Sequence, residues 1–139
     1  MNIKQEQSKK YMEEADLTFE AASAIFEKAR EEDIDLWAQV VKTCYDSLEH
    51  AVCSAIASKE GKIPIQHPEK ISRFVALFNI PNHIEERISF WLSRRAPAQY
   101  VDIKNDRLFV PHEIFAEQDA EKAIKESREI ISFIKQLLA

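Results

Sequence analysis

Two adjacent arginines near the end of a helical pattern are the residues of this chain best suited to chemistry. Arg94 and Arg95 follow an apolar stripe, with Pro97, Gln99 and Tyr100 close behind. Arginine stays charged at any working pH and presents a planar fork of donors that fits phosphate oxygens. We therefore treat Arg94, Arg95, Gln99 and Tyr100 as a candidate anion-binding segment and expect Pro97 to halt the helix. The alternative is structural, because paired arginines at a helix C-terminus also complement its dipole and its last free carbonyls.

The composition predicts an all-α protein. The 139 residues are 45% apolar and 31% charged, which is enough apolar material for the core of one domain over residues 1–139. The chain has a single glycine, whereas strand-rich folds need glycine for tight turns and bulges. The same count excludes the glycine-rich loops that bind dinucleotides or nucleotide phosphates, and we expect no cofactor.

The charge distribution leaves room for a local anion site. A formal net charge of −5 argues against a chain that coats nucleic acid through bulk positive charge. Residues 59–107 are the exception, with nine Lys and Arg against six Asp and Glu. This net basic stretch contains both arginines.

The first sixty residues predict two helices. Apolar residues at alternating steps of three and four indicate a helix over about 8–31, for which Ser8 is a candidate cap. A second, broader apolar stripe begins at Trp37 and ends before Gly61, as expected for the central helix of a bundle.

The remaining residues predict two or three further helices and one long loop. A short helix opens at Pro68 and must stop before Pro81, and Asn82 is placed to cap the helix that carries the arginines. Residues 100–112 break the helical period and favour a long loop over a hairpin, because their turn lacks glycine. The last helix is expected over 117–138. Long helices joined by short loops predict an up-and-down bundle of four to five helices.

Outside the arginine segment, few side chains indicate chemistry. Cys44 and Cys53 lie in an apolar helical pattern without a second pair, so we predict buried thiols and no metal site. Glu49, on the central helix, is expected either to be exposed or to pair with an arginine of the fourth helix. His50 lies on the central helix and is not expected to bind a metal. His67 and His83 are expected at helix starts, as capping or exposed residues, and His112 is expected as a surface or helix-start residue. No signal peptide or membrane span is visible, so we expect a cytoplasmic protein.

Taken in order, these motifs resemble the HEPN family of prokaryotic helical domains. The likeness includes Tyr45-Asp46-Ser47-Leu48-Glu49-His50-Ala51 on the second helix and His67-Pro68 at the start of the third. It extends to the arginine–tyrosine segment and to Asp119-Ala120-Glu121-Lys122-Ala123-Ile124 on the last helix, and so covers nearly the whole chain.

The resemblance implies a homodimer in which the arginine-bearing helix ends face one another. In active members, an arginine and a histidine four to six positions later form a metal-independent ribonuclease site. Histidine there serves as acid or base while the 2′-hydroxyl attacks, and arginine stabilises the phosphate charge. Here positions 98–101 are Ala, Gln, Tyr and Val, so neither arginine has its histidine. A tyrosine phenol is a poor proton acceptor at neutral pH, so Tyr100 is expected to position a phosphate or stack on a base.

Three functional classes follow. We favour a catalytically degenerate HEPN-like dimer that binds nucleotide or RNA, or a nucleotidyltransferase-like protein partner, through Arg94, Arg95, Gln99 and Tyr100, with Glu49 in support. The second class is a toxin-type endoribonuclease that uses Arg94, Arg95 and Tyr100 without the usual histidine. The third is a purely structural interaction bundle without a ligand.

Overall fold

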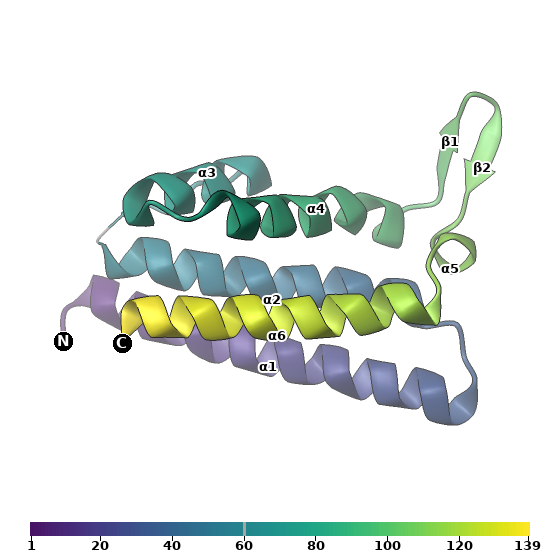
Figure 1. Cartoon of the computed structure of the whole chain (residues 1–139), viewed down its shortest axis with the longest axis horizontal. Helices are drawn as coiled ribbons and strands as arrows, with labels where there is room; N and C mark the ends of the chain where they lie inside the picture. The colour runs from purple at the N-terminus through teal and green to yellow at the C-terminus, as the bar shows by residue number, and fades with distance from the viewer. Residues whose placement is uncertain (60) are drawn as a thin grey trace.

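A computed structural model describes residues 1–59 and 61–139 and shows a helical bundle with one small hairpin (Figure 1). The elements in chain order are α1 (Ile3–Glu32), α2 (Trp37–Ser58), α3 (His67–Phe78), α4 (Asn82–Gln99), β1 (Asp102–Lys104), β2 (Arg107–Phe109), α5 (Pro111–Ile114) and α6 (Glu117–Leu138). The long helices alternate in direction, and both termini lie at the same end of the bundle (Figure 1). The expected all-α, up-and-down architecture is confirmed, and α6 has the bounds predicted for it.

Helix α2 is the centre of the bundle. It packs against α1 and α6 on one side and against α3 and α4 on the other (Figure 1). Most of its residues are buried, including Tyr45 and Leu48, which are fully enclosed. This burial explains why its apolar stripe is broader than that of the other helices, since a helix surrounded by neighbours must be apolar on most faces. Side chains on α2 therefore meet residues from every other long helix.

Helix α1 begins six residues earlier than Ser8 would place its cap. Asn2 is the true cap, because its side chain accepts a hydrogen bond from the Gln5 amide while the Gln5 side chain accepts one from the Asn2 amide. Ser8 instead contacts α2. Its hydroxyl donates to the Ser54 carbonyl at 2.8 Å, and the Ser54 hydroxyl donates to the Ser8 carbonyl at 2.7 Å. The small side chains thus join the two helices.

The single glycine lies where two parts of the chain come close together. A Cβ atom at Gly61 would lie 2.9 Å from Ile56 Cγ2 and 3.0 Å from the Ile56 carbonyl oxygen. The Gly61 amide donates to that same carbonyl at 3.1 Å. A larger residue would push the chain away from the end of α2, so close approach accounts for this glycine.

Helix α4 continues through the proline that was expected to halt it. It runs from Asn82 to Gln99 with Pro97 inside its last turn, so the prediction of a stop at Pro97 is wrong. A proline there removes one backbone donor, and the helix ends two residues later. The start of α4 also differs by one position, because Pro81 precedes the helix and Asn82 is its first residue.

Residues 100–112 form a hairpin and a short helix, and the expected long loop is wrong. β1 and β2 pair antiparallel with Ile103 opposite Leu108, and the turn between them holds Asn105 and Asp106 at φ 52° and 60°. A two-residue hairpin turn needs positive φ at both positions. Asn and Asp tolerate that left-handed conformation, so glycine was not required.

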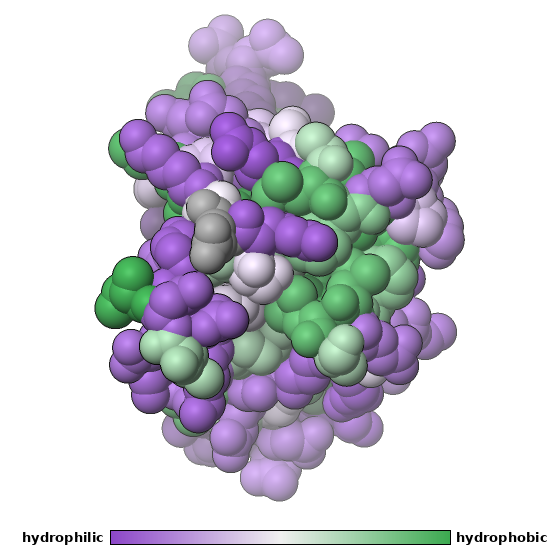
Figure 2. All heavy atoms as spheres, turned by 90° about the vertical axis from the view of Figure 1, so that its left-hand side faces the viewer, coloured by the Kyte–Doolittle hydropathy of each residue, from purple (hydrophilic) through white to green (hydrophobic). Residues whose placement is uncertain are grey.

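The surface at the other end of the molecule is partly apolar. Figure 2 shows the end where both termini lie, with hydrophobic residues gathered on one side of it and polar residues over the rest.

None of the helices formed by residues 1–59 and 61–139 combines the length and apolar character that crossing a membrane requires.

Candidate functional site

The two candidate arginines point to different surroundings. Arg95 is mostly buried and turns toward α2, where its Nε donates to Asp46 Oδ1 at 3.0 Å. Lys42 Nζ lies 3.3 Å from the other oxygen of Asp46. Arg95 therefore already has a carboxylate partner.

Arg94 turns the other way and lies over an aromatic ring. Its guanidinium carbon is 4.8 Å from the centre of the Phe115 ring. A guanidinium stacked on a ring keeps its N–H donors at its edge available. Among the described residues Arg94 makes no ion pair, unlike Arg95. It is the better placed of the two arginines to bind an added anion.

A pocket of about 290 Å³ opens beside Arg94. It is formed by the end of α4, the hairpin and α5, and its lining comprises Arg94, Ala96, Pro97, Tyr100, Asp102, Lys104, Phe109 and Ile114. The structure thus brings Arg94 and Tyr100 together, whereas Arg95 and Gln99 do not line this pocket. We call it the Arg94 pocket.

The Arg94 pocket combines positive charge with aromatic surface. Arg94 and Lys104 carry two positive charges against the single carboxylate of Asp102. Tyr100 is 55% exposed, and its hydroxyl accepts a hydrogen bond from the Gln99 side chain at 3.2 Å. Two cations beside the rings of Tyr100 and Phe109 can bind a phosphate and stack on a base.

Sequence reasoning missed Lys104 and Phe109 in this pocket. The register pairs Asp102 with Phe109 and Lys104 with Arg107, so these side chains share one face of the hairpin. The signal for this shared face is the weak apolar alternation of residues 100–112 around Asn105-Asp106.

Glu49 has partners other than the arginine expected for it. The Tyr45 hydroxyl donates a hydrogen bond to Glu49 Oε2 at 2.9 Å, and Lys70 Nζ donates one to Oε1 at 2.8 Å. His67 Nδ1 lies 2.5 Å from Oε2. Both predicted states of Glu49 are wrong, because its side chain is only 15% exposed and its basic partners come from α3. His67 lies at the start of α3 as expected, but its ring is paired with Glu49, which was not expected.

The protonation states of this Glu49 cluster follow from its hydrogen bonds. Burial alone would raise the pKa of Glu49, but donors from Lys70, His67 and Tyr45 outweigh it and lower that pKa below the usual 4.5. Burial likewise opposes the charge of Lys70, yet its bond to Glu49 raises the Lys70 pKa. Since the Glu49 carboxylate only accepts, His67 Nδ1 must carry a proton. The cluster is a satisfied ionic network that ties α3 to α2.

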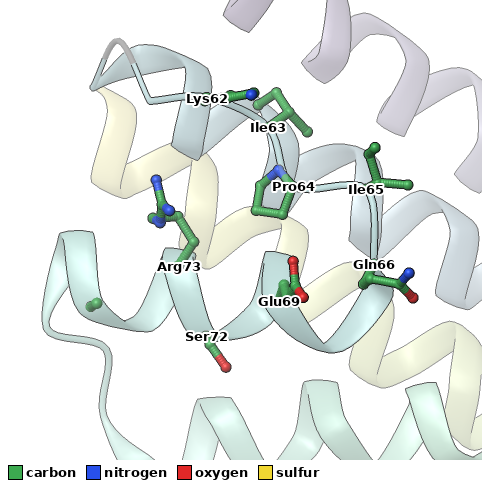
Figure 3. Close-up of a pocket in the computed structure, with 9 residues that line it drawn as sticks. Lys62, Ile63, Pro64, Ile65, Gln66, Glu69, Ser72 and Arg73 are labelled. Carbon is green, nitrogen blue, oxygen red and sulfur yellow. The ribbon is translucent and has the colours of Figure 1, made fainter.

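A larger hollow, of about 670 Å³, lies between α3 and the segment that precedes it. Figure 3 shows Glu69, Ser72 and Arg73 on α3 opposite residues 62–66. Its polar side chains are exposed, and within the described residues no hydrogen bond or ion pair orients Lys62, Glu69 or Arg73. This groove lacks the fixed cation and aromatic rings of the Arg94 pocket.

The remaining reactive side chains lie away from the Arg94 pocket. Burial raises the pKa of the Cys44 thiol to about 12 and that of Cys53 to about 11, so both are protonated and the predicted buried thiols are confirmed. Among the described residues no histidine lines the pocket. The same residues contain no cluster of three or more potential metal ligands.

Comparison with known proteins agrees with this fold. The HEPN domain profile matches residues 8–137. The crystal structure of an archaeal HEPN homologue is similar with a TM-score of 0.71 at 17% identity, and the match covers 95% of this chain and 98% of that chain. At that identity the likeness concerns the fold. A search of curated proteins finds none that matches this sequence. Because the HEPN profile spans nearly the whole chain, this protein belongs to the HEPN domain family.

Proposed function

We propose that this HEPN protein is a homodimer that binds the phosphate and base of a nucleotide or of RNA in the Arg94 pocket without cleaving the ligand. The observation that carries the proposal is the state of Arg94, which is held over Phe115 with no carboxylate partner among the described residues. Lys104 and Tyr100 line the same pocket and supply a second cation and a stacking surface.

The geometry favours binding over cleavage. Cleavage by the 2′-hydroxyl of RNA needs a base within hydrogen-bond reach of that hydroxyl. The titratable groups that line the Arg94 pocket are Arg94, Lys104, Tyr100 and Asp102. A cation cannot take a proton, and a phenol is a poor base at neutral pH. Asp102 Oδ1 already accepts a hydrogen bond from the Ile103 amide at 2.8 Å, and the Asp102 carboxylate shares the pocket with both cations.

Binding of single-stranded RNA and of a nucleoside triphosphate tests this function. We expect Arg94→Ala and Lys104→Ala each to weaken binding, with Arg94→Ala costing about tenfold and reducing the dependence on salt. Arg128→Ala is the matched control, because Arg128 also lies over an aromatic ring, that of Phe19, but lines a different pocket. Equal binding by wild type and Arg94→Ala would remove the proposal.

Cleavage is checked separately. RNA incubated with excess protein and a chelator is expected to stay intact. RNA fragments ending in 2′,3′-cyclic phosphate, formed by wild type and not by Arg94→Ala, would replace the binding function with the ribonuclease.

A further inference from the structure

An acidic side chain lines the Arg94 pocket although a phosphate does not need one there. Among the described residues of the lining, Asp102 is the only acid, beside the cations Arg94 and Lys104. Its negative charge repels a phosphate, so a pocket that bound phosphate alone would bind it more tightly without this residue. The carboxylate therefore calls for a second role in the pocket, toward a part of the ligand that donates hydrogen bonds.

The Asp102 carboxylate is free to accept such bonds. Its Oδ1 accepts one from the Ile103 amide at 2.8 Å, and its Oδ2 has no donor within residues 1–59 and 61–139. Over the same residues Asp102 makes no ion pair, even with the two cations of its own pocket. A carboxylate oxygen has two lone pairs, so both oxygens of Asp102 remain able to accept from a ligand.

The hairpin places this carboxylate beside an aromatic ring. Asp102 begins β1 and lies directly opposite Phe109, the last residue of β2. Residues opposite one another in an antiparallel pair have Cβ atoms about 5 Å apart. Tyr100 lines the same pocket two residues before Asp102, and its ring is largely exposed. A base that stacks on either ring therefore has an edge directed toward the carboxylate.

We propose that Asp102 reads the edge of the bound base and that this base is guanine, an inference that rests on the proposed function. An ionised carboxylate only accepts hydrogen bonds. Guanine alone among the four RNA bases carries two neighbouring donors, N1–H and the 2-amino group, on its Watson–Crick edge. Adenine and cytosine place one amino group next to an acceptor nitrogen, and uracil places N3–H between two carbonyl oxygens. Each of these three bases brings a negative atom against the carboxylate.

The pocket then divides the recognition of a guanine nucleotide among its residues. Arg94 and Lys104 bind the phosphate, the rings of Tyr100 and Phe109 stack on the base, and Asp102 selects it. The negative charge of Asp102 lowers phosphate affinity for every nucleotide, whereas only guanine recovers the loss through two hydrogen bonds. Asp102 is thus a specificity-determining residue of the Arg94 pocket.

Calorimetric titration with GTP, ATP, CTP and UTP tests the preference. We expect GTP to bind at least about tenfold more tightly than the other three, because a bidentate pair of this kind discriminates between bases by about that factor or more. Inosine triphosphate, which lacks the 2-amino group, should bind with intermediate affinity.

Asp102→Asn separates base reading from a structural role. Its amide oxygen still accepts from the Ile103 amide, but the second acceptor becomes a donor. GTP affinity should fall about tenfold, while ATP and UTP should bind as tightly as before or more tightly, because a charge that repels phosphate is gone. A merely structural role would weaken all four nucleotides alike, and that result overturns the inference.

Asp106→Asn is the matched control. It removes the same charge from the turn of the same hairpin, at a residue that does not line the pocket, and Asn tolerates the positive φ there. The order of the four nucleotides should not change in this variant. Circular dichroism verifies the fold of both variants.

Short oligouridylates with and without one central guanosine distinguish RNA from a free nucleotide as the source of the base. In either source, tighter binding of the guanosine form that is lost in Asp102→Asn supports the inference. Equal binding of all four nucleotides and of both RNAs, abolished in Arg94→Ala, overturns the guanine preference and leaves the proposed function standing. Absence of binding by every nucleotide and RNA removes both.

Discussion

The Glu49 cluster and the Arg94 pocket both gather charged and aromatic side chains, yet they differ in whether the charges are satisfied. Every oxygen of Glu49 accepts from a side chain of α2 or α3, and the cluster is largely enclosed. Arg94 lies on a ring at the rim of an open pocket and has no ion-pair partner among the described residues. Satisfied charges hold helices together, whereas an oriented and unpaired charge is available to a ligand. We therefore infer that the Glu49 cluster has a structural role, and the Arg94 pocket remains the proposed site for a ligand.

Removing the Glu49 carboxylate should have the largest effect. Glu49→Gln leaves the mostly buried Lys70 side chain without its counterion and should lower the free energy of unfolding by about 2–3 kcal/mol. Urea unfolding measures it. Glu117→Gln is the control, because its pair with Arg30 at 3.7 Å is half exposed and should be worth less than about 0.5 kcal/mol. If Glu49→Gln weakened RNA binding without lowering the free energy of unfolding, the Glu49 cluster could not be purely structural.

Removing an aromatic ring from the Arg94 pocket should affect binding and leave stability unchanged. Tyr100→Ala deletes an exposed stacking surface and should weaken RNA affinity by about 1–2 kcal/mol. Fluorescence anisotropy with labelled RNA measures this affinity. Tyr100→Phe keeps the ring and should bind nearly as well as wild type, so an equal loss in both variants would show that the hydroxyl matters and stacking does not.

At acidic pH the difference in the free energy of unfolding between wild type and Glu49→Gln should become smaller. Because the folded pKa of Glu49 lies below its ordinary 4.5, the carboxylate contributes its full stabilisation above pH 4.5. That contribution is lost as the pH falls through the folded pKa. Unfolding curves of both proteins between neutral and acidic pH measure the effect. A difference that stayed constant down to the lowest pH would mean that the lost stability does not come from the charge.

The smallest effect is expected where a charged pair is only partly enclosed. Asp46→Asn weakens the bond to Arg95 and should cost about 0.5–1 kcal/mol of stability. Ligand affinity should stay within about twofold, because Arg95 faces α2 and does not line the Arg94 pocket. If Asp46→Asn lowered the binding free energy by more than the free energy of unfolding, Arg95 would have to be counted among the residues that contact the ligand.

The helical framework was predictable because long apolar stripes report burial directly. The stripe of α6 predicted both of its ends, and the breadth of the α2 stripe predicted its central place. The conformation of the hairpin turn was harder to predict from the sequence. The Asn105-Asp106 turn needs only residues that tolerate positive φ, and a missing glycine was a poor guide to it.

Pairing across helices was the least predictable part of the site. Glu49 could meet any cation from α3 or α4, and only the packing of α3 on α2 selects Lys70 and His67. Arg94 and Arg95 are adjacent in sequence but turn to opposite environments, because neighbouring helical residues do not share a face. The sequence therefore predicts that the segment with Arg94 and Arg95 matters, but it does not predict which arginine pairs with Asp46 and which one lines the pocket.

Pro97 makes the last turn of α4, beside the Arg94 pocket, a place where the opening of the helix can be measured. Having no N–H, it leaves the Ser93 carbonyl without its usual donor four residues on, so the last turn of α4 has one backbone bond fewer than the turns before it. The Tyr100 amide still donates to the Ala96 carbonyl at 2.9 Å and closes that turn. The rate of hydrogen–deuterium exchange at the Tyr100 amide therefore reports the opening of this helix end separately from the unfolding of the bundle. Slower exchange at this amide in the presence of a ligand would show that the ligand binds beside the end of α4.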